Sequence, residues 1–185
     1  MSKFSIFQNI DETPDEIIEH DLYNDKNFLI NKQQVEEILK KCNVNYKISD
    51  LELYQRAFIH KSYIEKEECV KIVENKIGAL ELQKKSYERL EFLGDSVLGS
   101  IVVTYLFRRF FDQNEGTMTK YKARLVSKNA LSSFARMLNF KPYLVISKQI
   151  EENRGRENIN ILEDTFEAFV GAMLLDFDKQ YRRKK

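Results

Sequence analysis

Three acidic residues recur at helical spacing within one apolar stretch of the 185-residue sequence. Glu88, Glu91 and Asp95 are three and four residues apart in the segment SYERLEFLGDSVLGSIVVTYLF at positions 86–107. This spacing places side chains on one face of a helix, with Cβ atoms about 5–6 Å apart. Like charges at that distance destabilise a helix, and apolar surroundings add a desolvation cost. Another group must therefore offset the repulsion between these carboxylates.

A second apolar segment carries the same kind of pair. Asp164 and Glu167 are three residues apart in NILEDTFEAFVGAMLLDF at positions 160–177. Each pair taken alone is compatible with a solvated face or with ion pairs to Lys or Arg. Two pairs in apolar helices are harder to neutralise with side chains only. A divalent cation is the other solution, because carboxylate oxygens are hard ligands that suit Mg²⁺, with Mn²⁺ as a possible substitute.

Other metal and catalytic chemistries have little support. The chain contains two histidines, His20 and His60, and neither lies at ligand spacing from another His or Cys, which disfavours zinc, HExxH and Glu-x-x-His di-iron sites. The sequence GDS lacks the GxSxG context of a serine hydrolase, and there is no P-loop, so we expect no nucleotide cofactor. Magnesium held by acidic residues beside a phosphate is the chemistry that remains.

The composition is typical of a folded and mostly helical chain. Hydrophobic residues make up 43% of the sequence, while there are only two Pro and six Gly. Cys42 and Cys69 form no disulfide framework, which favours a reducing compartment. There is no run of eighteen apolar residues free of charge, and the N-terminal residues lack the apolar core of a signal peptide. We therefore expect an all-α, intracellular protein that does not insert into a membrane.

The acidic residues lie in two of several expected helices. One is expected at 31–42 with Asn31 as its N-cap, and one from about 49, capped by Ser49 or Asp50. The acidic stretch at 86–107 is expected to be a helix capped by Ser86 and largely buried in the core. Its glycines, Gly94 and Gly99, cost helix propensity, and we expect them to permit a close approach to another helix.

Two shorter helices are expected to follow, and the last helix carries the second acidic pair. We expect the first after Thr119 and the second after a cap at Ser127, with Pro142 as its end. The sequence ENRGREN at 152–158 is expected to form a polar loop. The final helix should be buried around Phe166 and Phe169.

Charge is unevenly distributed along the chain. Residues 1–27 contain seven acidic and two basic side chains, whereas the rest of the chain has 28 Lys and Arg against 22 Asp and Glu. We expect residues 1–30 to form a mobile acidic extension and residues 31–178 to form the domain, with an insertion at about 64–85. Residues 179–185 form a basic tail. Charge runs are usually solvated faces, although a polyanionic partner is possible.

Four blocks of the sequence together resemble one family. ERLEFLGDSVL at 88–98 resembles the signature of the ribonuclease III family, and AFIHKSY (57–63), EGTMTKYKARLVSKNAL (115–131) and LEDTFEAFVGAMLLD (162–176) follow its order of motifs. The resemblance covers roughly residues 46–178. It implies the all-helical ribonuclease III endonuclease fold.

The resemblance also implies roles for individual residues. Glu91, Asp95, Asp164 and Glu167 match the family's metal-binding catalytic acids. Phe92 matches its dimer-interface position, whereas without the resemblance Phe92 would be expected in the core of its own chain. Supporting roles beside the metal ligands, or contact with substrate, are implied for Glu88, His60 and Asn129; for His60 a buried structural role is favoured.

The implied activity is metal-dependent hydrolysis of double-stranded RNA by a homodimer, leaving 5′-phosphate and 3′-hydroxyl ends with short 3′ overhangs. We expect no double-stranded-RNA-binding domain within these 185 residues. Asn160 and Glu163 depart from the family pattern beside the second acidic pair. The alternative is an inactive ribonuclease III-like module for dimerisation or RNA scaffolding, although such relatives tend to lose catalytic acids. The cytoplasm or nucleus is the expected location, including that of a host cell for a viral protein.

Overall fold

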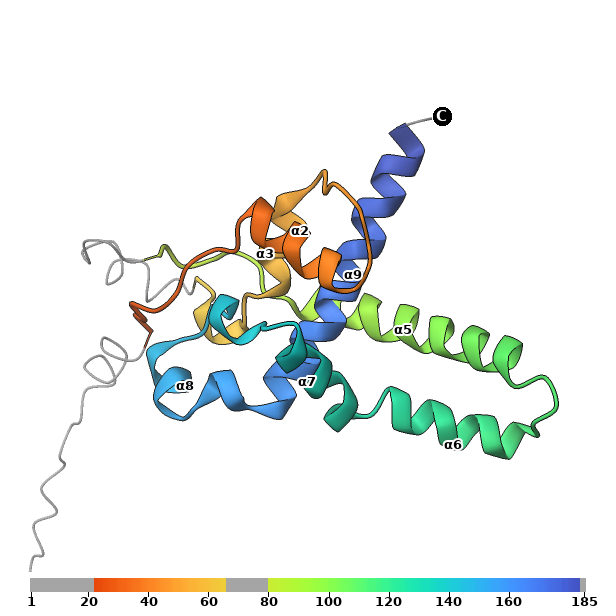
Figure 1. The fold of residues 1–185 in the computed structure, drawn as a ribbon. Coiled ribbons are helices and arrows are strands. Elements are labelled where there is room, and N and C mark those ends of the chain that lie inside the picture. Colours follow the sequence, from red (N-terminus) through yellow and green to blue (C-terminus); the bar gives the residue numbers. More distant parts are fainter. Residues whose placement is uncertain (1–21, 66–79, 184–185) are drawn as a thin grey trace, which may run out of the picture.

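The computed structural model describes residues 22–65 and 80–183, and within these ranges the chain is helical and has no strand. The all-α prediction is therefore confirmed. The described residues leave out His20, Cys69, most of the expected insertion, residues 1–21 of the expected extension, and residues 184–185. The elements, most of which are labelled in Figure 1, are α2 (Lys32–Lys41), α3 (Leu51–Ala57), η1 (Lys61–Tyr63), α5 (Glu88–Arg109), α6 (Glu115–Leu125), α7 (Lys128–Met137), η2 (Lys141–Tyr143), α8 (Lys148–Glu152), η3 (Gly155–Glu157) and α9 (Ile159–Arg183).

Helix α9 runs through the middle of the domain and packs against α5, α7 and α3 (Figure 1). An aromatic cluster joins the end of α3 and the start of η2 to α9, since the ring of Phe140 lies 5.0 Å from that of Phe58 and 5.1 Å from that of Phe169. All three rings are buried. Burial of such large apolar side chains is the main favourable contribution to folding, so α9 is held firmly where its acidic residues are needed.

The packed part of the chain begins before the boundary expected at residue 31. Asn24, Asn27 and Ile30 are buried, although the sequence analysis assigned them to the mobile extension. The side-chain amides of Asn24 and Asn27 donate to the carbonyl oxygen of Ile146 at 3.1 and 2.9 Å. Asn31 caps α2 as expected, in a capping box with Gln34.

Three expected element boundaries are wrong. Helix α6 begins at Glu115 rather than after Thr119, because the side chain of Asn114 caps it by accepting from the backbone N–H of Thr117. Helix α7 is capped by Ser127 as expected but ends at Met137, well before Pro142, and the chain turns at Asn139 with φ 61°. The expected loop at 152–158 contains the last residue of α8 and all of η3.

Helix α5 is much more exposed than its apolar sequence predicts. Its buried residues are Leu90, Gly94 and Leu106, whereas Phe92 is 79% exposed and Phe107 is 69% exposed. The helix meets α9 near its start and then extends from the domain beside α6 (Figure 1). The prediction of a largely buried helix is therefore wrong, because an apolar sequence does not reveal which partner covers it.

By length and composition alone, α5 could also cross a membrane. Its first two turns nevertheless carry Glu88, Glu91 and Asp95, and charged groups at membrane depth are costly. The same turns pack against α9. A protein partner accounts better for the exposed apolar face than lipid does.

Candidate metal centre

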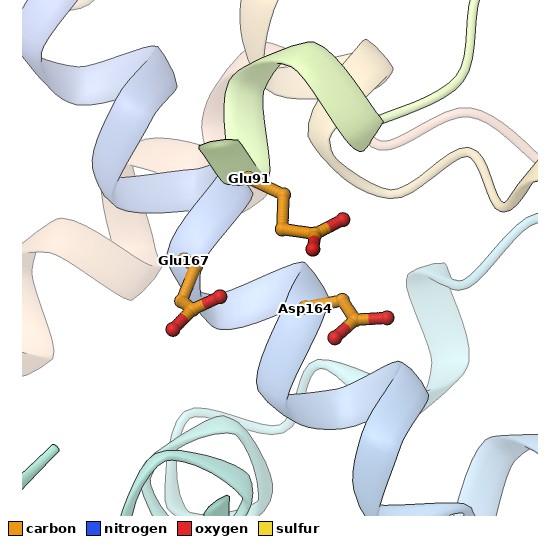
Figure 2. Close-up of side chains that lie close together, drawn as sticks. All are labelled: Glu91, Asp164 and Glu167. Atoms are coloured by element: carbon orange, nitrogen blue, oxygen red, sulfur yellow. The ribbon is translucent and has the colours of Figure 1, made fainter. Parts of the chain in front are cut away.

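Three of the predicted acidic residues converge where α5 meets α9. Glu91 comes from α5, while Asp164 and Glu167 come from α9, and one carboxylate oxygen of each lies within 4.8 Å of the others. Figure 2 shows the three side chains gathered on one side of the two helices. All three are partly or wholly shielded from solvent, and Glu167 is only 9% exposed. The fold thus places three acidic groups together in a partly shielded site.

Two glycines allow this crossing. A Cβ atom on Gly94 would lie 1.8 Å from the carbonyl oxygen of Glu167, and one on Gly171 would lie 2.2 Å from the carbonyl oxygen of Leu90. Only glycine therefore permits the two backbones to touch here. The expected role of Gly94 is borne out by these contacts. The role of Gly171 was not predicted from the sequence. Its position one turn after Glu167 was the signal that could have indicated a close helix contact.

Gly99 does not have the role expected within this chain. A Cβ atom at this position would have no heavy atom within 4 Å in the described parts of the chain. The residue lies seven positions after Phe92, which places it on the same exposed side of α5. Its small size is therefore not explained by the packing of α5 against α9.

Asp95 lies beside the cluster rather than within it. Its side chain is exposed, and it does not belong to the group of three whose oxygens converge. It is close enough for its charge to be the leading electrostatic cause, after burial, of the raised pKa of Glu167. Asp95 therefore borders the site from one turn further along α5.

The cluster holds its acidic groups with difficulty. Burial, followed by the charges of Asp95, Glu163 and Glu91, raises the pKa of Glu167 to about 8. Burial is also the main cause of the raised pKa values of Glu91 and Asp164. A proton or a cation is needed to relieve this concentration of charge near neutral pH.

Glu163 adds a further acid, as its departure from the family pattern suggested. Its carboxylate lies 3.6 Å from the Nζ atom of Lys128, the first residue of α7. Burial nevertheless raises the pKa of Glu163, and Asp164 contributes in the same direction against the lowering by Lys128. One lysine therefore compensates only part of the negative charge at this crossing.

Tyr87 contacts the cluster from the start of α5. Its hydroxyl donates to Oδ2 of Asp164 at 3.1 Å, and this bond lowers the pKa of Asp164 against the larger effect of burial. Tyr87 occupies the N-cap position expected for Ser86, while Ser86 bonds the backbone and side chain of Glu88. The role of Tyr87 was not predicted from the sequence. A tyrosine beside an acidic motif carries no local signal that its hydroxyl donates to a residue on a distant helix.

The remaining predicted residues lie around the cluster. Glu88 is exposed and pairs with Lys61 at 3.7 Å. His60 is buried, and its Nδ1 atom accepts from the backbone N–H of Ser62 at 3.1 Å. Burial, reinforced by Lys61, lowers the pKa of His60 to about 4, so the ring is neutral at physiological pH. Asn129 is exposed on α7, and its backbone oxygen accepts from nearby serines.

The donor set fits a hard divalent cation. The converging ligand atoms of Glu91, Asp164 and Glu167 are all carboxylate oxygens, which Mg²⁺ and Mn²⁺ prefer over softer ligands. The raised pKa of Glu167 adds a second indication, because a cation would offset the charge that burial penalises. The residues present therefore suit such an ion.

Comparison with known proteins identifies the family of this chain. A family model described as Ribonuclease-III-like matches residues 50–183, a range that contains both acidic segments. The chain belongs to the ribonuclease-III-like family. The resemblance inferred from the four sequence blocks is thereby confirmed, and with it the family's helical fold.

Relatives from a virus and from bacteria resemble this family member at similar levels. A probable ribonuclease 3 of Acanthamoeba polyphaga mimivirus is 37% identical over 158 residues, covering 84% of this chain and 29% of the viral protein. Ribonuclease 3 of Streptococcus pyogenes is 37% identical over 144 residues, covering 78% of this chain and 57% of the bacterial protein. The match thus covers between 29% and 57% of the length of these relatives.

Solved structures of ribonuclease III nuclease domains match the fold. The nuclease domain from Campylobacter jejuni superposes with a TM-score of 0.63 at 32% identity, covering 79% of this chain and 84% of that one. A second structure of that domain, also with a TM-score of 0.63, concerns structural flexibility in the region involved in dimer formation. The observed helical arrangement is therefore that of a ribonuclease III nuclease domain.

Proposed function

We propose that this chain is the catalytic part of a divalent-metal-dependent endonuclease that hydrolyses phosphodiester bonds of double-stranded RNA. The observation that carries the proposal is the convergence of Glu91, Asp164 and Glu167 from two helices, in a member of the ribonuclease-III-like family. The proposed products carry 5′-phosphate and 3′-hydroxyl ends with short 3′ overhangs. An intracellular location, expected from the sequence, fits an RNA substrate.

The carboxylates of the cluster provide the proposed ligands. Glu91, Asp164 and Glu167 offer converging oxygens, and Asp95 adds negative charge at the border of the site. When bound there, Mg²⁺ supplies a more acidic water and stabilises negative charge on the phosphate. In this proposal the carboxylates serve to hold and orient the ion, and no side chain acts as the nucleophile. Lys128 limits the excess negative charge beside Asp164 by pairing with Glu163.

Basic residues near the site are proposed to contact the RNA backbone. Lys120, Lys122 and Arg124 are exposed along α6, which runs beside α5. Side chains cannot read the deep, narrow major groove of A-form RNA, so contacts to phosphates and 2′-hydroxyls are expected, with little sequence preference. The substrate is therefore proposed to be recognised by its shape.

The proposed active form is a homodimer formed through α5. Phe92, Ile101 and Tyr105 are 79%, 56% and 57% exposed on this helix. Gly99 lies between them with open space in front of it, which would allow a second copy to approach closely. Dimer formation by the nuclease domain of the Campylobacter jejuni relative supports a dimer here as well. The inactive scaffold is not favoured, because all four acids are retained and three of them converge.

Cleavage of a labelled long RNA duplex tests this function. The assay compares Mg²⁺ with EDTA at low ionic strength, since phosphate contacts weaken with salt. We expect cutting in Mg²⁺ only. Glu167→Gln should reduce the rate by at least about 100-fold, because losing a ligand exceeds the 10–100-fold effect of losing a group that supports one.

Asp178→Asn is the matched control for that substitution. Asp178 is an exposed acid about three turns beyond Glu167 on the same helix. Its variant should cut at the rate of the unmodified chain. Equal rates for Glu167→Gln and the control would reject the carboxylate assignment, and cutting of single strands in preference to duplex would reject the proposed substrate.

A further inference from the structure

The hydroxyl of Tyr87 contacts the acidic cluster from the start of α5. The residue is 2% exposed, and its hydroxyl donates to Oδ2 of Asp164 at 3.1 Å. The two residues lie on different helices, 77 positions apart in sequence. A hydrogen bond to a charged group is stronger than one between neutral groups, so this partly buried contact joins the start of α5 to the acidic side of α9.

Several contacts hold the tyrosine in place. Its backbone N–H donates to the carbonyl oxygen of Ile59 at 2.9 Å, and its ring meets that of His60 edge-on at 5.7 Å. Its own carbonyl oxygen accepts from the backbone N–H of Glu91 at 2.9 Å. The hydroxyl therefore projects from a rigid base, and the same residue sets the position of the helical turn that carries Glu91.

The bond restricts Asp164 without using all of its acceptor capacity. A carboxylate has two oxygens with about four lone-pair sites, and the hydroxyl occupies one of them. The remaining sites stay available for a cation, while rotation of the carboxylate is restrained. Groups that hold metal ligands in this way commonly contribute 10–100-fold to metal affinity.

We propose that Tyr87 is a positioning residue that orients the Asp164 carboxylate for a divalent cation shared with Glu91 and Glu167. The proposal rests on the proposed function only in taking the acidic cluster as a cation site. It does not require that RNA be the substrate. Tyr87 touches neither RNA nor the ion and acts through Asp164.

Tyr54 provides a matched control. It is also fully buried, and its hydroxyl donates to Oδ2 of Asp176, another carboxylate of α9, at 3.4 Å. Asp176 lies outside the cluster. Tyr87→Phe and Tyr54→Phe therefore each remove one buried hydroxyl that bonds an aspartate on α9. Only the hydroxyl of Tyr87 bonds an aspartate of the proposed cation site.

The test is the affinity of the full chain for Mn²⁺ without RNA. Electron paramagnetic resonance measures the concentration of the free ion at fixed pH. We expect Tyr87→Phe to weaken binding about 10-fold, the lower end of the range for supporting groups, and Tyr54→Phe to leave it unchanged. Thermal melting of both variants by circular dichroism checks that each remains folded. Equal Mn²⁺ affinity in Tyr87→Phe and the unmodified chain would overturn the proposal, as would equal weakening by both variants.

A third variant separates this proposal from the proposed function. Glu167→Gln should abolish the same Mn²⁺ binding. If it does, yet the unmodified chain cuts no RNA duplex, the nuclease function fails while the role of Tyr87 stands on its own measurement. If Glu167→Gln leaves Mn²⁺ binding unchanged, the cluster is not the cation site and the positioning role of Tyr87 fails with it.

Discussion

Gly94 lies directly against the backbone of Glu167, at the point where α5 crosses α9. A Cβ atom there would stand 1.8 Å from the carbonyl oxygen of Glu167, closer than any real contact allows. Glu91 lies one turn before Gly94 on α5. The close contact between the two helices at Gly94 therefore also brings the carboxylate of Glu91 to those of α9.

Gly94→Ala should separate the two helices. We expect it to lower the free energy of unfolding by about 3 kcal/mol, the upper end of the usual cost of overpacking, and to weaken metal binding by displacing Glu91 from α9. Denaturant unfolding followed by circular dichroism measures the first effect. Gly116→Ala is the control, since a Cβ atom there meets only the Asn114 side chain at an ordinary 3.5 Å. A loss of stability in the control equal to that in Gly94→Ala would contradict this account.

The stability of the metal-free chain should depend on the ionisation of Glu167. Its pKa is about 8 in the folded state, against 4.5 as the ordinary value, so the folded chain retains a proton that the unfolded chain releases between these values. The free energy of unfolding should therefore fall as pH rises from about 4.5 to 8. Melting temperatures measured in EDTA across this range test the prediction. Glu167→Gln should flatten the dependence, and Mg²⁺ should raise the melting temperature more at pH 8 than at pH 5.

Asp95→Asn should lower the pKa of Glu167. Asp95 is the leading charged neighbour that raises this pKa, after burial itself. Removing its charge should therefore make ionisation of Glu167 easier and stabilise the metal-free chain at pH 8, even though metal binding weakens. An NMR titration of the Glu167 carboxyl carbon measures the shift directly.

Glu88→Gln is the comparison for that titration. Glu88 raises the pKa of Glu91, whereas the largest charge effects on the pKa of Glu167 come from Asp95 and Glu163. Its variant should leave the midpoint of the Glu167 titration in place. A midpoint that moves equally in both variants would mean that the cluster responds to total charge rather than to the position of Asp95.

Phe92→Glu should convert the proposed dimer to a monomer. Phe92 is 79% exposed, and a charge at the centre of an apolar interface carries a large desolvation cost. Light scattering after size-exclusion chromatography should give a mass near 22.0 kDa for the variant and twice that value for the unmodified chain. Phe111→Glu, at a 91% exposed site beyond the end of α5, should remain dimeric. A monomeric unmodified chain would reject the proposed assembly.

The local elements of the fold were largely predictable from sequence. Asn31 and Ser127 are polar caps ahead of apolar periodicity, and each caps its helix in the structure. The start of α6 and the end of α7 were predicted wrongly. Asn114 caps α6 and Asn139 turns the chain after α7, but other residues nearby were equally plausible as caps or helix ends. The family and its all-α fold were also readable, since four ordered blocks carry them.

The sequence by itself determined the chemical character of the site. Spacing alone placed Asp164 and Glu167 on one face of their helix, and Glu91 on the acidic face of a different helix. This was possible because the period of a helix is a local property. Oxygen ligands and the scarcity of histidine then favoured Mg²⁺ over zinc.

Only the tertiary structure decided which residues meet. It brought Glu91 to the α9 pair through Gly94 and Gly171, left Asp95 at the border, and directed the Tyr87 hydroxyl at Asp164. It also exposed the apolar face of α5 that the sequence suggested was buried. These relationships depend on the crossing of helices far apart in the chain, and that crossing is set by the packing of many side chains together rather than by any local pattern.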